Sequence, residues 1–530
     1  MSLLLLSLAC TTDTADTGDG AVADYRLTLQ PVVPLDVNPF DGVDRIDLVL
    51  DSGVGDPLRV TLDAPASGDS ALAERLPALE GVRVVVEGYA DGELVAWGRS
   101  APVTVTEGEV AVNVFVTRPD AVVRLGGLPE TAAQGQGLAL GAGRFLYVGG
   151  ASMKNGRYKG LDTLSILDLE APEAELTFAP VGTMPAYVDT NGDEETARWG
   201  FSMTRLTAGD AGKYLLVGGG TSDGYSDASV LTADARLFDP ETLTFEDSLP
   251  DKDTLYTART RHAAILTQDG AVVVWGGFGG ADDRHFVALP DGEIYDPSAR
   301  AFTKIEAISS GSEYVSGSVG VALADLGSDG TLVAGGIRTV DGETATEWTP
   351  TDVSLRVSLR GDTTEVSGFG AVAAHAMVTL PDGDVLSFGG VSIAGQVGFD
   401  GTAPATDKVY KYDRGAASWS QIGRMELARA GHRAVLLDED HILIAGGASS
   451  WGPLEFEDGA LSCVELWDIP NETATMVGSC DESDDAAGLP GRAQEPALFH
   501  DPDWGVLVAG GFDGSNGVVG TAGLYTPAPD

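Results

Sequence analysis

Short apolar segments followed by a Gly-Gly pair recur along most of the chain. Seven of them consist of four residues, mostly Val, Leu, Ile or aromatic, and then the two glycines. Apolar runs of this length, bounded by turn residues, predict buried β-strands rather than helices. The seven segments are Phe145–Gly150, Tyr214–Gly219, Val272–Gly277, Thr331–Gly336, Val385–Gly390, Ile442–Gly447 and Val506–Gly511.

The spacing of these segments indicates a repeat. Their first glycines are separated by 69, 58, 59, 54, 57 and 64 residues, and each unit contains four strand-like runs. The third run often ends in aromatic-Asp-Pro, as in Leu237–Pro240 and Ile294–Pro297, and tight polar turns such as Gln268–Gly270 join the first run to the second. A period of this size is typical of a propeller or a solenoid.

The pattern resembles the kelch repeat, the four-stranded blade of the β-propellers of the galactose oxidase central-domain superfamily. The resemblance covers about residues 121–530 and predicts an all-β fold with seven blades in residues 119–530. The last unit lacks a fourth strand, and an unassigned strand at about 121–125 precedes the first unit. We therefore expect this N-terminal strand to complete the last blade and close the ring.

Three shorter regions precede the propeller. Residues 22–118 contain strand-like runs without the Gly-Gly repeat, and we expect a small Ig-like or transthyretin-like β-sandwich there. Residues 11–21 are polar and acidic and predict a flexible tether. Residues 1–10 are an apolar run ending in Cys10, and they resemble a bacterial lipoprotein signal in which this cysteine carries the lipid. The whole arrangement is similar to bacterial kelch-repeat lipoproteins, which implies a lipid-anchored protein of the cell envelope, at the outer membrane.

Charge and cysteine content narrow the partners and the compartment. The chain has 32 Lys and Arg against 80 Asp and Glu, a formal net charge of −48, which argues against nucleic acid as a ligand. We expect contact with the membrane only through the N-terminal lipid. Cys463 and Cys480 flank a predicted hairpin whose turn lies near Asn471, so we expect them to face each other and form a disulfide, as suits an exported protein.

Histidines at equivalent repeat positions are the first candidates for a metal site. His262, His375 and His432 each lie 14 residues before the first glycine of their segment. The recurrence of histidine at one repeat position favours a structural role in the blades over a role as a metal ligand. The copper radical oxidases of the superfamily need two Tyr, two His and a Cys linked to a Tyr, and the cysteines here are already assigned. We therefore expect no catalytic residue of that kind and no cofactor.

One acidic loop offers a weak calcium candidate. Asp189, Asn191, Asp193 and Glu195 place oxygen atoms at alternate positions, as calcium loops do, but the full twelve-residue pattern is missing. A solvated acidic loop is the alternative.

Long connections on one face of the propeller are the expected place for a ligand. Because neighbouring strands of a blade are antiparallel, the loops between second and third strands lie on the same face as the connections between blades. The tight turns lie on the opposite face. The long-loop face carries eight aromatic residues that could contact a ligand: Tyr158, Tyr187, Tyr225, Phe286, Trp348, Phe399, Trp451 and Phe456.

These observations predict a non-enzymatic, surface-tethered binding module that recognises a protein or a cell-envelope glycan through the long-loop face, with the small domain as a spacer. Two alternatives stay open. The first is a carbohydrate-active enzyme with acidic residues at the mouth of the propeller channel. The second is a structural scaffold of the envelope.

Overall fold

The fold is built almost entirely of β-strands. The computed structural model describes residues 6–9, 25–53, 56–63, 79–105, 108–154, 157–170, 176–189, 192–220, 231–249, 254–281, 285–305, 309–310, 313–314, 319–340, 347–398, 401–453, 459–480, 488–515 and 517–529. Within these residues the single helix is a 3₁₀ turn at Gly327–Asp329. None of the described helical structure has the length and hydropathy of a membrane span.

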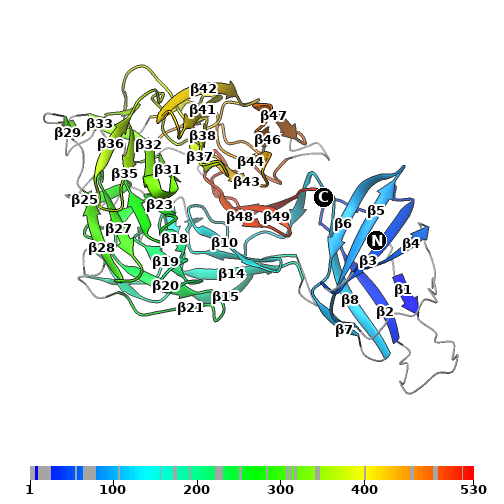
Figure 1. Ribbon diagram of the computed structural model, residues 1–530. Coiled ribbons are helices and arrows are strands. Elements are labelled where there is room, and N and C mark those ends of the chain that lie inside the picture. Colours follow the sequence, from blue (N-terminus) through cyan, green and yellow to red (C-terminus); the bar gives the residue numbers. More distant parts are fainter. Residues whose placement is uncertain are drawn as a thin grey trace.

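A ring of four-stranded sheets forms the larger part of the molecule (Figure 1). In the described part of the chain there are seven such sheets, and in each one the Gly-Gly segment supplies the second strand from the centre. Blade four, the least regular copy in sequence, still forms all four strands. From the centre outwards the sheets are β10 (Gln136–Gly141), β11 (Arg144–Val148), β14 (Thr163–Asp168), β15 (Ala179–Thr183); β18 (Ser202–Arg205), β19 (Tyr214–Val217), β20 (Ala235–Asp239), β21 (Thr244–Phe245); β23 (Ala263–Leu266), β24 (Val272–Trp275), β27 (Gly292–Asp296), β28 (Ala301–Ile305); β31 (Val321–Asp325), β32 (Thr331–Gly335), β35 (Ser354–Val357), β36 (Thr363–Val366); β37 (Ala376–Thr379), β38 (Val385–Phe388), β41 (Lys408–Asp413), β42 (Ser418–Arg424); β43 (Arg433–Leu436), β44 (His441–Ala445), β46 (Val464–Asp468), β47 (Thr473–Val477); and β48 (Ala497–Asp501), β49 (Gly505–Ala509), β50 (Ala522–Thr526), β9 (Ala121–Leu125).

The last sheet joins two distant parts of the chain. Strand β9 pairs antiparallel with β50, with Ala121 opposite Thr526 and Leu125 opposite Ala522. This is the outer position that the sequence assigns to the N-terminal strand. The first and last strands of the propeller therefore share one sheet, which closes the ring without a free outer edge at this point.

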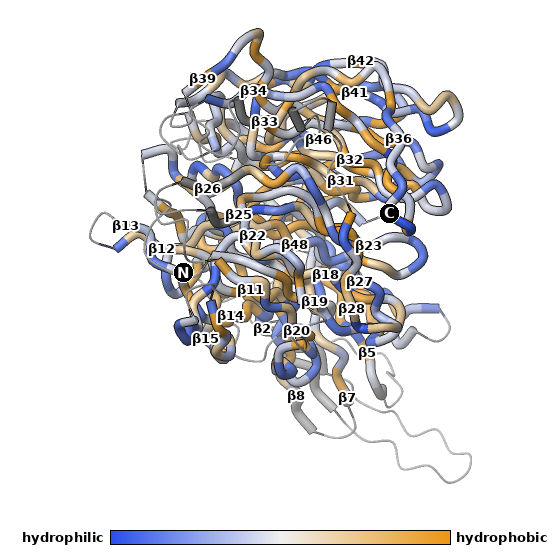
Figure 2. The backbone as a smooth tube through the Cα atoms, turned by 90° about the vertical axis from the view of Figure 1, so that its left-hand side faces the viewer, coloured by the Kyte–Doolittle hydropathy of each residue, from blue (hydrophilic) through white to orange (hydrophobic). Residues whose placement is uncertain are grey.

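Apolar side chains fill the spaces between neighbouring sheets. Figure 2 shows the hydrophobic positions concentrated on the strands. One cluster joins the second sheet to the third and contains Leu215, Leu237, Val272, Tyr295 and Phe302. Because each sheet buries both faces against its neighbours, the strands are apolar on both sides, as the continuous apolar runs of the sequence predict.

Further short strands cover the face on which the blades connect. They form small sheets of two or three strands from segments that the sequence suggests are open loops. Because these segments pair with one another, their apolar residues turn inwards and cover the blades. Their strands are β12 (Ala151–Lys154), β13 (Arg157–Gly160), β16 (Tyr187–Val188), β17 (Glu194–Glu195), β22 (Arg259–Thr260), β25 (Phe278–Ala281), β26 (His285–Ala288), β29 (Ser309–Ser310), β30 (Glu313–Tyr314), β33 (Ile337–Val340), β34 (Glu347–Pro350), β39 (Val397–Gly398), β40 (Ala403–Pro404) and β45 (Ser450–Trp451).

The small domain is a β structure with two halves joined at one corner. One half contains β1, β2 and β8, the other contains β6, β5, β3 and β4, and only three residue pairs between β6 and β8 link them. Apolar residues of both halves, such as Leu29 and Leu48, share one core. The strands are β1 (Leu6–Ala9), β2 (Tyr25–Val32), β3 (Arg45–Asp51), β4 (Leu58–Asp63), β5 (Leu79–Ala90), β6 (Glu93–Arg99), β7 (Val103–Val105) and β8 (Gly108–Thr117).

The start of the chain is described only in part. Strand β1 lies within the predicted signal 1–10 and pairs antiparallel with β2. Cys10 and the predicted tether 11–21 lie outside the described residues.

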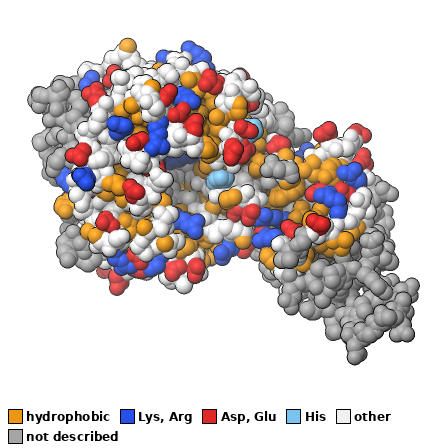
Figure 3. Space-filling view, viewed as in Figure 1, with side chains coloured by type: hydrophobic (Ala, Val, Ile, Leu, Met, Phe, Trp, Pro, Cys, Tyr) orange, Lys and Arg blue, Asp and Glu red, His pale blue; other side chains and the backbone are white. Residues whose placement is uncertain are grey.

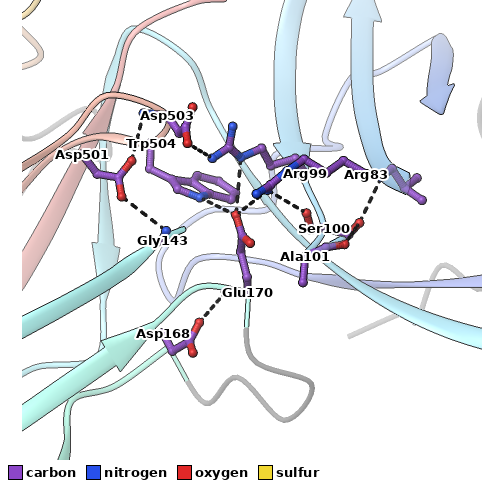
Figure 4. A network of polar contacts seen from close by, with 11 residues as sticks. Arg83, Arg99, Ser100, Ala101, Gly143, Asp168, Glu170, Asp501, Asp503 and Trp504 are labelled. Carbon is purple, nitrogen blue, oxygen red and sulfur yellow. Dashed lines mark hydrogen bonds and ion pairs between the residues drawn. The ribbon is translucent and has the colours of Figure 1, made fainter. Parts of the chain in front are cut away.

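The small domain packs directly on the propeller. Figure 4 shows the polar part of this contact. Glu170 lies just after β14 of the first sheet, and its carboxylate is 3.0 Å from Nη1 of Arg83 in the small domain. Arg99 of the small domain pairs with Asp503 of the last sheet at 2.8 Å. The indole of Trp504 packs edge-on against Trp97, with ring centres 5.5 Å apart. The domain therefore contacts both sheets that meet where the ring closes.

Candidate binding site at the mouth of the channel

Seven residues with left-handed backbone surround the central channel. Each lies immediately before the innermost strand of its sheet, and all have φ between 51° and 68°. Their position places them on the long-loop face, where the blades connect. The seven are Gln134, Gly200, Arg261, Gly320, Ala374, Gly431 and Glu495.

Backbone hydrogen bonds connect these residues around the channel. The N–H of Gly200 donates to the carbonyl of Gln134 at 3.0 Å, and Arg261 donates to Gly200 at 2.6 Å. The same link runs onward from Gly320 through Ala374 and Gly431 to Glu495, at 2.7–2.8 Å. These bonds link the first three blades to one another, and the last four blades to one another, at the mouth of the channel.

Four of the seven positions hold residues other than glycine, although this conformation costs an L-residue about 1–3 kcal/mol. Three of the four carry polar side chains that meet in the channel. Nη2 of Arg261 is 2.6 Å from Oε1 of Glu495, and Nε2 of Gln134 donates to Oε2 of Glu495 at 2.9 Å. Strain of this kind concentrates at functional positions, and here it aims three polar groups of distant blades at one point.

Two further residues complete the group. Nε1 of the buried Trp451 donates to Oε1 of Glu495 at 3.0 Å. Arg433, the first residue of β43, donates from Nε to the carbonyl of Pro496 at 3.1 Å and is exposed to the channel solvent. We call Gln134, Arg261, Arg433, Trp451 and Glu495 the mouth site.

The carboxylate of the mouth site is held in its ionised form. Burial acts to raise the pKa of Glu495, but the charge of Arg261 and the hydrogen bonds from Trp451 and Gln134 outweigh it, so the pKa lies below its usual value. Burial lowers the pKa of Arg433, and the charge of Glu495 opposes that shift. An arginine stays protonated under such shifts. The site therefore holds two cations and one anion.

A cavity of about 170 Å³ opens at this point. Its wall contains the five residues of the mouth site together with residues such as Gln136 and Ala263 at the start of inner strands. The volume is below the roughly 300–1,000 Å³ typical of sites for drug-sized ligands, so the cavity takes a small group. Several residues of the wall carry buried polar atoms without a hydrogen-bond partner among the described residues, among them Oε1 of Gln134 and both ring nitrogens of His375.

The three repeat-equivalent histidines pack between blades. A Cβ placed on Gly218, Gly335 or Gly389 would lie 3.1, 2.7 or 3.0 Å from Cε1 of His262, His375 or His432, respectively. Each ring thus rests on the first glycine of the preceding Gly-Gly pair. Burial lowers the pKa of His262 and of His375 to about 3, and lowers that of His432 as well, so the rings are neutral at pH 7.

None of the four predicted aromatic contacts whose side chains the structure describes is exposed. Trp348 and Trp451 are buried and pack edge-on, with ring centres 5.9 Å apart. Tyr187 is buried, lies under the guanidinium of Arg198 and donates to the carbonyl of Ala197 at 2.5 Å. Tyr158 is half-buried beside Phe512. Of these four described side chains, only that of Trp451 belongs to the cavity wall. Tyr225, Phe399 and Phe456, and the side chain of Phe286, lie outside the described residues.

The loop that contains the calcium candidate forms a β-hairpin in its described residues. Tyr187 and Val188 pair with Glu195 and Glu194, and Oδ1 of Asp189 accepts the backbone N–H of Asp193 at 2.9 Å. This side-chain contact closes the turn. Asn191 lies outside the described residues. No cluster of three His, Cys, Asp or Glu side chains suited to a metal occurs in the part of the chain that the structure describes.

The disulfide forms between Cys463 and Cys480, with Cα atoms 4.8 Å apart. The hairpin register differs from the expected one by two residues, because Val464 pairs with Val477. Gly478 has φ of 71° and redirects the chain beyond the strand, which carries Cys480 to its partner.

Charge on the ring face is mixed. Figure 3 shows acidic and basic side chains interspersed over the face in view, without a basic patch.

Comparison with known proteins supports the fold. No family model and no curated protein matches the chain. Among solved structures, the structure of YjhT is similar over 66% of this chain and 99% of its own, with 14% identity and a TM-score of 0.43. A fungal alcohol oxidase of the AA5 family, solved with copper, covers 77% of this chain and 75% of its own, with 13% identity and a TM-score of 0.50. At this level of identity the likeness to the fungal oxidase concerns the fold alone, and it supports a β-propeller.

The residues here do not fit the copper of that oxidase. The described cavity wall contains neither Tyr nor Cys, and the rings of its three histidines rest on glycines between blades.

Proposed function

We propose that this protein is a non-enzymatic binding module of the cell envelope that recognises a glycan at the mouth site. One observation carries the proposal: the five polar or aromatic side chains of the mouth site, from four different blades, converge on a small open cavity. Three of them have strained backbone, and a fourth, Trp451, is buried. Fixed donors and acceptors beside an indole are the groups that bind sugars.

A small cavity favours a glycan unit over a protein surface. The cavity of about 170 Å³ admits one small polar group, whereas a stable protein interface buries on the order of 800 Å² on each partner. The aromatic residues that would anchor a protein, such as Trp348, are buried in the structure.

The arrangement gives little support to a hydrolase. Glycoside hydrolysis uses a pair of carboxyl groups, one on each side of the scissile bond. Glu495 is the only carboxylate in the described cavity wall, and three donors occupy its oxygens. A carboxylate held in this way is a poor proton donor or acceptor, because each proton transfer would break these bonds.

Export and lipid anchoring belong to the same proposal. The apolar run before Cys10 and the disulfide of Cys463 and Cys480 support them. Labelling of the producing cells with a palmitate analogue should mark the wild-type protein and leave Cys10→Ser unmarked. Equal labelling of both would contradict the anchor.

Titration with defined envelope glycans tests the binding proposal. We expect saturable binding by the wild-type protein, loss of affinity of about tenfold in Gln136→Ala, and none in the matched control Gln268→Ala. Gln136 lines the cavity, whereas Gln268 lies in a tight turn on the other face. NMR spectra of the glycan after prolonged incubation should be unchanged. Chemical conversion of the glycan, or equal binding by both variants, would overturn the proposal.

A further inference from the structure

Arg433 is a cation of the mouth site without a counter-ion at contact distance. Its Nε donates to the carbonyl of Pro496, and its two terminal nitrogens have no partner among the described residues. It is exposed to solvent although it lies within the channel. A guanidinium whose terminal nitrogens are free and face a concave wall is available to an anionic partner that enters the cavity.

The other charges of the cavity are already paired. Arg261 contacts Glu495 and also donates to the carbonyl of Pro453. Glu495 accepts from Arg261, Trp451 and Gln134. The three histidines of the cavity wall are neutral at pH 7. The described wall thus has one cation in excess, in a chain whose net charge is −48.

Acceptors and neutral polar groups lie around this cation. Gln134 and His375 belong to the wall of the same cavity, and Oε1 of Gln134 and both ring nitrogens of His375 are buried there without a hydrogen-bond partner among the described residues. They can bond hydroxyl groups, whereas the flat pair of terminal nitrogens of an arginine matches the two oxygens of a carboxylate. The site therefore complements a small molecule that carries both kinds of group.

We infer that the ligand of the mouth site is a hydroxylated compound with one carboxylate, and that Arg433 binds this carboxylate through its two terminal nitrogens. The inference rests on the proposed glycan binding and specifies its chemistry: the unit that enters the cavity is acidic. It also explains why a strongly acidic protein has a net positive cavity, because the carboxylate of the bound ligand neutralises the excess cation.

Matched pairs of ligands test the inference with the full-length protein. Calorimetric titrations would compare glucuronate with glucose, galacturonate with galactose, and glycerate with glycerol, at low and moderate salt. Each pair differs in the replacement of a CH₂OH group by a carboxylate. The variants are Arg433→Gln, which keeps a donor and removes the charge, Arg433→Lys, and the control Arg360→Gln. Arg360 is an exposed arginine that lies outside the cavity wall.

We expect at least one acid to bind ten times or more tightly than its neutral partner, with affinity that falls as salt rises. Arg433→Gln should lose this preference, Arg433→Lys should keep part of it, and Arg360→Gln should keep all of it. Because Arg433 is exposed and its side chain donates a single hydrogen bond, to the carbonyl of Pro496, its removal should leave the melting temperature nearly unchanged.

Two outcomes overturn the inference and are distinguishable from each other. If neutral glycans bind at the mouth site as tightly as their acids, and Arg433→Gln binds like wild type, the carboxylate assignment fails and the proposed function stands. If neither acids nor neutral glycans bind, both fail.

Discussion

Trp504 of the last sheet donates its indole N–H to the carboxylate of Glu170 in the first sheet, at 3.1 Å. The two residues are 334 positions apart in the chain, and the bond crosses the point where the ring closes. Arg83 and Arg99 of the small domain meet the same carboxylate oxygen at 3.0 and 3.5 Å. Ring closure and domain docking therefore depend on one buried carboxylate.

Replacing this carboxylate should weaken both contacts. The side chain of Glu170 is 5% exposed, so Glu170→Ala leaves two arginines and an indole without their acceptor. Loss of one partner of a buried charge pair costs about 3–5 kcal/mol, and partial exposure of Arg83 reduces this to about 2 kcal/mol. Calorimetric melting measures the effect. Glu246→Ala, which removes an exposed ion pair, should change stability by less than about 0.5 kcal/mol. An equal effect of the two variants would contradict the assignment.

A buried ion pair inside blade six should show strong coupling. Arg429 contacts Glu465, both side chains are fully buried, and Arg429 also donates to the carbonyls of Gly446 and Cys463. We expect Arg429→Met to lower the free energy of unfolding by about 3–5 kcal/mol, because it leaves a buried carboxylate without its cation. Adding Glu465→Gln should restore part of the loss. A double-mutant cycle with no coupling energy would argue against this role.

The disulfide should stabilise the same blade. It closes a loop with a sequence separation of 17, for which the loop-entropy model gives roughly 3 kcal/mol. Cys463→Ser/Cys480→Ser, or reduction with a thiol, should lower the melting temperature. The wild-type protein should show no free thiol at these positions by mass spectrometry after alkylation. Complete alkylation under non-reducing conditions would contradict the bond.

The buried histidines predict a loss of stability in acid. The pKa of His375 is about 3 in the folded protein and about 6.5 in an unfolded chain. Below pH 6.5 the unfolded state therefore binds a proton that the folded state does not, and the free energy of unfolding falls as pH decreases toward 3. The slope is about 1.4 kcal/mol per pH unit for each such histidine. Denaturation between pH 7 and 5 should show a smaller slope for His375→Gln than for wild type; identical slopes would refute the prediction.

The repeat made the architecture predictable. Each Gly-Gly segment, such as Val272–Gly277 or Ile442–Gly447, supplies the second strand of a sheet, because a continuous apolar run with fixed turn residues has few other solutions. The outer position of β9 follows from counting strands in the last unit. The two-residue difference in the cysteine hairpin arises from Gly478, whose effect on strand pairing a symmetric count does not include.

The binding site was less predictable, because its signal lies in backbone conformation. Aromatic residues such as Trp348 gave no indication of which way their rings turn, and pairing of the long loops turns them inwards. The mouth-site residues Gln134, Arg261 and Glu495 do lie at one repeat position, 15 residues before the first glycine. Gly320 and Gly431 occupy the same repeat position, and they indicate that the backbone there is left-handed. Polar residues at this position become informative only once that conformation is known.

The contact between each histidine and the preceding glycine has a consequence for how such a protein can be rearranged. The interlocking pair spans the boundary of two sequence repeats: His375 belongs to one unit and Gly335 to the one before it. A unit moved, duplicated or exchanged as one continuous piece of sequence would carry the histidine of one pair and the glycine of another. A grafted unit therefore packs well only where its new neighbour supplies the matching histidine or glycine. A unit suited to recombination begins and ends in the middle of a blade, so that each histidine–glycine pair stays together.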